Sequence, residues 1–304
     1  MQLNGVINVR KEPGYTSHDV VAVLRGMLKA SKVGHTGTLD PEATGVLPVC
    51  VGKATKVATM IMGSDKEYIA ELLFGAETDT QDATGQVVKK FAYTYDADAV
   101  RAAVASFKGC YEQIPPMYSA VKVGGMKLYE MAREGLEVER KPRPVEIKEI
   151  EIVAEFSEGE GHGLRLRVVC SKGTYIRTLC EDIGKKLGYG AYMKSLVRTR
   201  SGPYKLEESV SLDEIRSMIQ AGNSEGFLQD LSSLFADLPV KQVIPEEDIM
   251  LCNGNYLTYA SEEIGRELGQ IFRMQTSDGK LAGLYKVSEL LEGETRLRAY
   301  KMFV

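Results

Sequence analysis

Residues 34–49 form the segment that most constrains how this chain can fold. The segment reads GHTGTLDPEATGVLPV and places three glycines, two prolines and a single aspartate between apolar runs that are typical of strands. Glycine permits backbone conformations that other residues resist. Pro41 fixes the chain after Asp40 and biases Asp40 itself toward an extended conformation. The loop is therefore shaped around one carboxylate, and we predict that it presents Asp40 to a ligand.

Other kinds of site that contain glycine-rich loops or a reactive aspartate match this sequence poorly. A phosphate-binding loop at Gly52-Lys53 would need glycine at position 47 and a hydroxyl at position 54, where the chain has Leu47 and Ala54. An aspartyl-phosphate phosphatase would need a buried apolar strand before Asp40, but the residues 36–38 are Thr-Gly-Thr. A hydrolase or phosphatase with Asp40 as nucleophile would also need a second carboxylate for a divalent metal. It is kept as an alternative that a chelator would test.

Histidines and cysteines do not predict a metal site. The histidines, His18, His35 and His162, are few and dispersed, and His35 is expected to face the Asp40 loop beside it. The five cysteines are odd in number, scattered and never spaced Cys-x-x-Cys, which argues against a disulfide framework or a zinc site. We interpret them as small, half-buried apolar residues in a reducing compartment.

Length and composition predict a protein of two domains. The chain has 304 residues, of which 44% are hydrophobic, as in ordinary globular proteins. Its apolar runs are interrupted too soon to span a bilayer, and its first residues lack the basic head and apolar stretch of a signal peptide. We therefore expect a cytoplasmic protein without membrane contact.

Charge is distributed unevenly along the chain. The net charge of −4 argues by itself against a nucleic-acid partner. Residues 165–205, however, hold ten basic and two acidic side chains, whereas residues 206–304 hold nine basic and seventeen acidic ones. This uneven distribution is consistent with a basic groove that binds a polyanion. It is equally consistent with a charged surface that only faces solvent.

Periodicity and turn residues divide the chain into a larger mixed part and a small β-rich part. Composition shifts near residues 238–239, and residues 240–304 read as short strands with turns. Residues 113–143, with Pro115-Pro116, Gly124-Gly125 and bases at both ends, read as an inserted arm. Helices are predicted over residues 17–28, 96–107, 174–187 and 212–221, and strands over 5–10, 46–51, 68–74, 145–156 and 163–170.

Three further segments accompany the Asp40 loop. They are KEYIA at 66–70, QIPPMYSAVK at 113–122 and CSKGTYIR at 170–177. Together with the loop, and in this order, they resemble the bacterial tRNA pseudouridine synthase B (TruB) family over nearly the whole chain. The resemblance implies an α+β pseudouridine-synthase fold, with a mixed, mostly antiparallel sheet and flanking helices over residues 1–238. Residues 239–304 would form a PUA-like β domain.

The resemblance also implies an activity. Members of the family convert the T-loop uridine at position 55 of tRNA to pseudouridine, without cofactor or metal. We accordingly expect a monomer that binds the T arm of tRNA and has no obligate protein partner. A non-catalytic protein that binds or folds tRNA is the alternative, because it would need the basic region but not Asp40.

Site residues follow from the resemblance position by position. Asp40 matches the nucleophilic aspartate and Arg177 the arginine paired with it. Tyr68 matches the tyrosine that stacks on the target base, Leu196 the leucine packed against that base, and Tyr175 the tyrosine beside the arginine. Without the resemblance, the alternating strand around Tyr68 would favour a core position for this residue, and Leu196 would also be assigned to the core.

The remaining predicted contacts involve the RNA outside the target base. His35 matches the histidine that engages the T loop as the uridine flips out of its stack. Lys122 in the arm, and Lys172 and Arg198 in the basic region, are predicted to contact the RNA backbone, because phosphate contacts set the register of a bound RNA.

Overall fold

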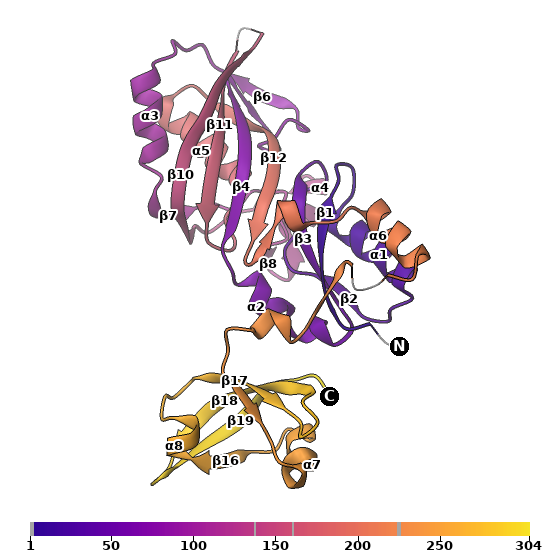
Figure 1. Ribbon diagram of the computed structural model, residues 1–304. Helices are drawn as coiled ribbons and strands as arrows, with labels where there is room; N and C mark the ends of the chain where they lie inside the picture. The colour runs from indigo at the N-terminus through magenta and orange to yellow at the C-terminus, as the bar shows by residue number, and fades with distance from the viewer. Residues whose placement is uncertain (1–2, 137, 160, 224–225) are drawn as a thin grey trace.

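The computed structural model describes residues 3–136, 138–159, 161–223 and 226–304, and Figure 1 shows two bodies joined end to end. Within these residues the larger body contains a ten-stranded sheet and the smaller body a five-stranded sheet. The strands of the larger sheet are β1 (Gly5–Lys11), β2 (Val33–His35), β3 (Thr44–Val51), β4 (Lys66–Phe74), β7 (Gly109–Gln113), β10 (Arg143–Glu158), β11 (Gly161–Cys170), β12 (Ala191–Ser201), β13 (Tyr204–Lys205) and β14 (Leu228–Asp230).

The larger sheet follows the order β14–β1–β3–β12–β4–β11–β10–β7, with β2 beside β3 and β13 beside β12. Its paired strands are antiparallel except β12 and β3, which run parallel. The expected α+β class with a mixed, mostly antiparallel sheet is confirmed. The parallel pair matters for function, because it brings the middle of β12 against the strand that leaves the Asp40 loop.

Helices cover one face of this sheet (Figure 1). Helix α1 begins after Thr16, whose hydroxyl accepts from the N–H of Asp19 in a capping box, and α5 ends at Gly188 in the left-handed conformation. Both pack apolar side chains into the core formed by the same face of β1, β3, β4 and β11. The helices of this layer are α1 (Ser17–Leu28), α3 (Ala97–Ala105), α5 (Ile176–Leu187) and α6 (Leu212–Gln220).

Strand alternation sends every second side chain of β3 to the opposite face. Leu47 and Val49 belong to the helix-covered core, whereas Val46 and Cys50 pack in a separate cluster with Leu284 and Phe303 of the smaller body. The two bodies therefore share buried apolar contacts, although each also has its own core.

The smaller body is built from strands in the order β15–β17–β18–β19–β16. Its elements are β15 (Val240–Gln242), α7 (Asp248–Cys252), β16 (Leu257–Ala260), α8 (Ser261–Ile264), β17 (Ile271–Gln275), β18 (Leu281–Leu290) and β19 (Glu294–Met302). The division of the chain into domains at residues 238 and 239 stays a prediction.

The segment predicted to be an inserted arm connects β7 to β10, which are paired neighbours in the sheet. It contains the hairpin β8 (Lys122–Val123) and β9 (Met126–Lys127), followed by α4 (Leu128–Arg133). A second hairpin, β5 (Ala76–Thr78) and β6 (Val87–Lys90), follows β4. Among the described residues, no helix has the length and apolar character needed to cross a membrane.

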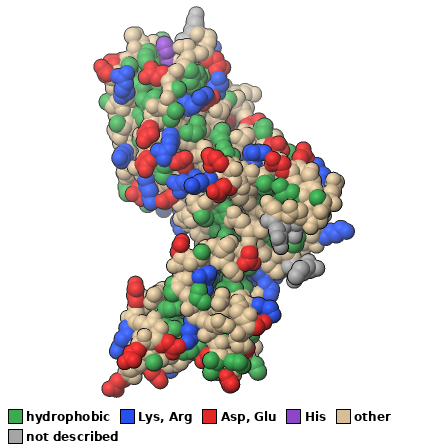
Figure 2. All heavy atoms as spheres, viewed as in Figure 1, with side chains coloured by type: hydrophobic (Ala, Val, Ile, Leu, Met, Phe, Trp, Pro, Cys, Tyr) green, Lys and Arg blue, Asp and Glu red, His purple; other side chains and the backbone are tan. Residues whose placement is uncertain are grey.

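The face of the sheet opposite the helices carries ion pairs rather than free bases. Arg165 of β11 lies 2.7 Å from Glu71 of β4, and Arg167 lies 2.7 Å from both Glu67 and Glu149 on its two neighbouring strands. Figure 2 shows basic and acidic side chains interspersed over this part of the surface. The excess of bases counted along residues 165–205 is therefore neutralised in part, and for Arg165, Arg167 and Lys194 the paired carboxylates lie on other strands. Five of its ten bases pair with carboxylates: Arg165, Arg167, Arg177, Lys185 and Lys194.

Candidate active site

The loop that carries Asp40 is held by hydrogen bonds along both of its limbs. The Thr36 hydroxyl donates to the carbonyl of Pro48 at 3.1 Å, across the β2–β3 pair. On the helix side, the N–H of Leu39 donates to the hydroxyl of Ser17 on α1 at 2.9 Å. These contacts fix the backbone immediately before Asp40 between the sheet and α1.

Lys11, at the end of β1, fixes the backbone that follows Asp40. Its side chain is buried, and its ammonium donates to the carbonyls of Pro41 and Ala43 at 2.7 Å each. Burial lowers the pKa of this ammonium to about 8, and the carboxylates of Glu42 and Asp40 oppose that shift. Sequence reasoning missed Lys11. The one sequence feature that could have identified Lys11 is its position on the inward face of a strand, because a buried lysine needs hydrogen-bond acceptors for its ammonium.

Asp40 forms a bidentate ion pair with Arg177 at the start of α5. The arginine Nε lies 2.9 Å from Oδ2, and Nη2 donates to Oδ1 at 3.2 Å. The same guanidinium donates to the carbonyls of Thr80 at 3.0 Å and Tyr118 at 2.9 Å. The Arg177 side chain is 5% exposed and the Asp40 side chain 36%. Three segments thus hold the arginine in place, while the carboxylate keeps one side open to a ligand.

A second carboxylate shares this guanidinium. Asp82, in the connection between β5 and β6, has an oxygen 3.9 Å from Nε of Arg177. Burial is the largest influence on Asp40 and raises its pKa, Asp82 raises it further, and Arg177 opposes both. Arg177 is therefore the main group that favours the ionised form of Asp40, with a smaller contribution from Lys11. None of the sequence motifs included Asp82. Among the described residues, histidine, cysteine and acidic side chains do not gather into a metal-binding group.

Tyr68 and Leu196 lie on the same face of the paired strands β4 and β12. Tyr68 is opposite Arg198, and Leu196 is opposite Ala70, two residues along β4. Tyr68 and Leu196 are both 8% exposed. Both are therefore part of the core in this structure.

His35 lies on the segment that leads to Asp40, and Tyr175 lies two residues before Arg177. The imidazole Nδ1 of His35 accepts from the N–H of Gly37 at 3.3 Å, and burial lowers the pKa of the ring, which favours its neutral form at pH 7. The backbone of Tyr175 exchanges two hydrogen bonds with the buried amide of Gln113, at 2.8 and 2.9 Å. Gln113, the first residue of the segment 113–122 singled out in the sequence, thereby ties the arm to the corner that carries Arg177.

The three residues predicted to contact RNA phosphates lie in different environments. Lys122 and Lys172 are exposed, as a phosphate contact requires. Arg198 is 1% exposed, and its guanidinium donates to backbone carbonyls of the Asp40 loop. This burial argues against the phosphate contact predicted for Arg198, because its strand register turns the side chain into the protein.

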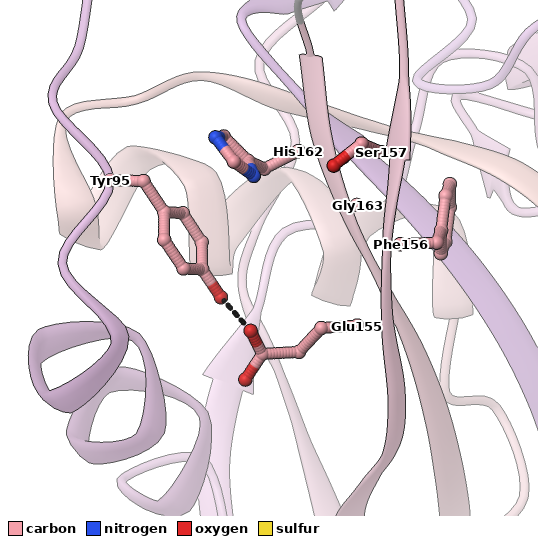
Figure 3. A pocket seen from close by; sticks show the side chains of 6 residues that line it. All are labelled: Tyr95, Glu155, Phe156, Ser157, His162 and Gly163. Carbon is pink, nitrogen blue, oxygen red and sulfur yellow. Dashed lines mark hydrogen bonds between the residues drawn. The ribbon is translucent and has the colours of Figure 1, made fainter.

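A hollow of about 210 Å³ lies at the start of β11, the end of this strand that is remote from the Arg177 corner (Figure 3). Its lining includes Tyr95, whose hydroxyl donates to Glu155 at 2.9 Å and whose ring stacks on His162 with centroids 4.5 Å apart. Cys170, at the other end of β11, leads into the Arg177 corner, and a strand advances by about 3.3 Å per residue. The hollow is therefore more than about 20 Å along the strand from that corner, and it is separate from the Asp40 site.

Known protein families and relatives match the part of the chain that forms this site. Residues 25–176 match the TruB family pseudouridylate synthase (N terminal domain) model, and residues 177–236 match the tRNA pseudouridylate synthase B C-terminal domain model. The tRNA pseudouridine synthase B of Halalkalibacterium halodurans is 42% identical over 296 residues, 96% of each chain. That of Alkaliphilus oremlandii is 44% identical over 270 residues, 88% of each chain. The Bacillus subtilis enzyme is 48% identical over 240 residues, 78% of each chain.

Solved structures share the fold over nearly the whole chain. A chain in the crystal structure of a Cbf5–Nop10–Gar1 complex is 30% identical with a TM-score of 0.70, covering 99% of this chain and 85% of that one. A chain of an H/ACA ribonucleoprotein bound to a substrate RNA containing 2′-deoxyuridine has 27% identity, the same TM-score and the same coverage. The second, five-stranded sheet therefore lies within the region of structural similarity.

Proposed function

The chain belongs to the TruB family of pseudouridylate synthases, and from this premise we propose that it isomerises uridine 55 in the T loop of tRNA, with Asp40 as nucleophile and without a cofactor. The enzyme class, an isomerase that makes pseudouridine in tRNA, follows from the family. The observation that supports the mechanism is the bidentate Asp40–Arg177 pair, in which the arginine is buried and the carboxylate is accessible.

The reaction needs one nucleophile and no redox partner. The bond from ribose C1′ to uracil N1 breaks, the freed base turns, and a bond from C1′ to C5 forms. The C5 hydrogen leaves as a proton and N1 gains one, so atoms and electrons balance without a further reactant. An ionised carboxylate can attack and later leave. Arg177, at 2.9 and 3.2 Å, supplies the charge-assisted hydrogen bonds that keep Asp40 ionised and oriented.

The detached base has to be held while it turns. An aromatic face such as that of Tyr68 stabilises a stacked base by about 1–3 kcal/mol. The T-loop uridine must first flip out of its stack. Because Tyr68 and Leu196 are each 8% exposed, we propose that RNA binding uncovers them as the base enters. The arm takes part in this rearrangement, since the carbonyl of Tyr118 on the arm accepts a hydrogen bond from Arg177.

The T arm is the proposed ligand, with Lys122 and Lys172 on its phosphates. Both lysines are exposed, Lys122 on the arm and Lys172 at the corner before Arg177. We propose that the enzyme binds this stem-loop as a monomer and without an obligate protein partner.

Tritium release tests the target position and the need for a metal. The native chain is given tRNA transcripts with tritium at C5 of uridine, either unaltered or with cytidine in place of uridine 55, each without and with EDTA. Release from the unaltered tRNA alone is expected, because only rearrangement frees the C5 hydrogen. Equal release from both transcripts would refute the assignment of position 55. Loss of release on addition of EDTA would refute metal-free catalysis and favour a metal-dependent use of Asp40.

A further inference from the structure

Arg198 has no place in the chemistry above, yet it is among the largest fully buried side chains in the described part of the chain. It lies on β12 and is 1% exposed. A buried guanidinium is costly unless it is well hydrogen-bonded, and a carboxylate partner is the usual solution. Among the described residues, however, no ion pair of Arg198 is found; its partners are backbone carbonyls. This arrangement requires an explanation other than charge pairing.

The carbonyls that Arg198 binds lie on both limbs of the Asp40 loop. Its Nε donates to Val46 at 2.7 Å, on the limb that follows Asp40. Its Nη2 donates to Gly37 at 3.1 Å, and Nη1 lies 3.5 Å from the carbonyl of Thr38, on the limb that precedes Asp40. One rigid, planar group therefore cross-links the two ends of the segment that carries the carboxylate. The flexible ammonium of lysine lacks this fixed fork.

Local backbone geometry allows the side chain to reach the loop. At the parallel pairing of β12 with β3, Arg198 lies opposite Gly45. Gly45 has φ +102°, and a Cβ there would be 2.2 Å from the carbonyl oxygen of Arg198. Only glycine permits both this conformation and this close approach. The two strands thus meet closely where the arginine passes under the loop.

Arg198 also neighbours the residue proposed to stack on the base. Tyr68 lies directly opposite Arg198 across the β4–β12 pair. The residue that binds both limbs of the Asp40 loop is thus the cross-strand neighbour of Tyr68.

We propose that Arg198 is a positioning residue, which fixes Asp40 against Tyr68 by cross-linking both limbs of the Asp40 loop. This inference rests on the proposed role of Asp40. It predicts that substitution of Arg198 lowers the rate of the chemical step and leaves the affinity for RNA unchanged. A misplacement of about 1 Å from a change remote from the chemistry can reduce a rate on the order of 100-fold.

The test compares Arg198→Met and Arg198→Lys with Arg200→Met and the native chain. Arg200 is a matched control, because it lies two residues along β12, is half-buried, and donates to Gly202 within its own turn. Single-turnover tritium release at saturating enzyme gives the chemical rate, and titration of tRNA at several salt concentrations gives Kd and its salt slope. We expect Arg198→Met to reduce the chemical rate about 100-fold. We expect Kd to stay within about threefold of the native value and the salt slope to be unchanged. Arg198→Lys should recover part of the rate, and Arg200→Met should keep the native rate.

Two outcomes would overturn the inference. Weaker tRNA binding with a salt slope smaller by about 1, at a native chemical rate, would make Arg198 a phosphate contact. A native rate in a folded Arg198 variant would leave it a purely structural residue. If circular dichroism shows that Arg198→Met does not fold, Arg198→Lys decides between these outcomes. Absence of tritium release by the native chain would instead refute the proposed function.

Discussion

Replacement of Arg177 by methionine removes the positive charge beside Asp40 and keeps most of the side-chain volume. The nitrogens lie 2.9 and 3.2 Å from the carboxylate oxygens, so the charge centres are about 4 Å apart. At that separation two unit charges interact by about 1 kcal/mol in water and about 4 kcal/mol near a protein surface. Since 1.36 kcal/mol corresponds to one pKa unit, loss of Arg177 should raise the pKa of Asp40 by about 1–3 units.

The sign of the effect on activity follows from the form that reacts. In the proposed mechanism Asp40 attacks as the carboxylate, and its pKa is already raised by burial and by Asp82. Without Arg177 the carboxylate forms only at higher pH. The acid limb of the single-turnover profile should therefore shift to higher pH by about 1–3 units, and activity lost at neutral pH should return in part as pH rises.

Arg177→Lys is the matched control for this experiment. Lysine keeps the charge but loses the bidentate geometry, so we expect a lower rate with the acid limb near its native position. Tritium release from T-arm RNA between pH 5.5 and 9 measures both variants, and circular dichroism verifies that they are folded. A loss in Arg177→Met that is the same at every pH would refute the argument that this arginine controls the ionisation of Asp40.

Three further predictions concern the loop, the RNA and the contact between the two bodies. Gly45→Ala should cost on the order of 1–3 kcal/mol of stability in urea denaturation, because its φ is +102° and its Cβ would meet β12 at 2.2 Å. Gly34→Ala, in open space, should be nearly neutral, and equal effects would contradict this account of the loop. Lys172→Ala should weaken tRNA binding and reduce the salt slope by about 1, whereas an unchanged slope would show that Lys172 does not touch phosphate. Phe303→Ala should lower the denaturation midpoint by the equivalent of about 3–5 kcal/mol, since the ring is 3% exposed and stacks on Phe235. A change below about 1 kcal/mol would show that the shared cluster contributes little to stability.

Sequence reasoning located the Asp40 loop and the Arg177 corner because both lie in short motifs dense in glycine, proline and charge. The structure brings Asp40 and Arg177 together, and it places Tyr68 and Leu196 on one face of neighbouring strands. The α+β class could be predicted from the same segments. The roles of these side chains in catalysis stay predictions.

The residues that were missed depend on which strands are neighbours, and local sequence does not contain that information. Lys11 and Asp82 act on Asp40 through segments remote in sequence. The count of bases over residues 165–205 supported a polyanion groove and a solvated charged face equally, because it omitted the acids of β4 and β10, which pair with some of those bases across the sheet. Arg198 was assigned to RNA by its charge alone, whereas its register turns it inward.

The most direct test of the central claim compares the native chain with Asp40→Asn. Both are mixed at saturating enzyme with a T-arm stem-loop that carries 5-tritiated uridine, and binding of the same RNA is measured in parallel. If Asp40 is the nucleophile, the native chain releases tritium, and Asp40→Asn releases none while it binds the RNA with nearly native affinity. Tritium release by Asp40→Asn at a rate near the native one would contradict the account, and so would loss of RNA binding equal to the loss of turnover.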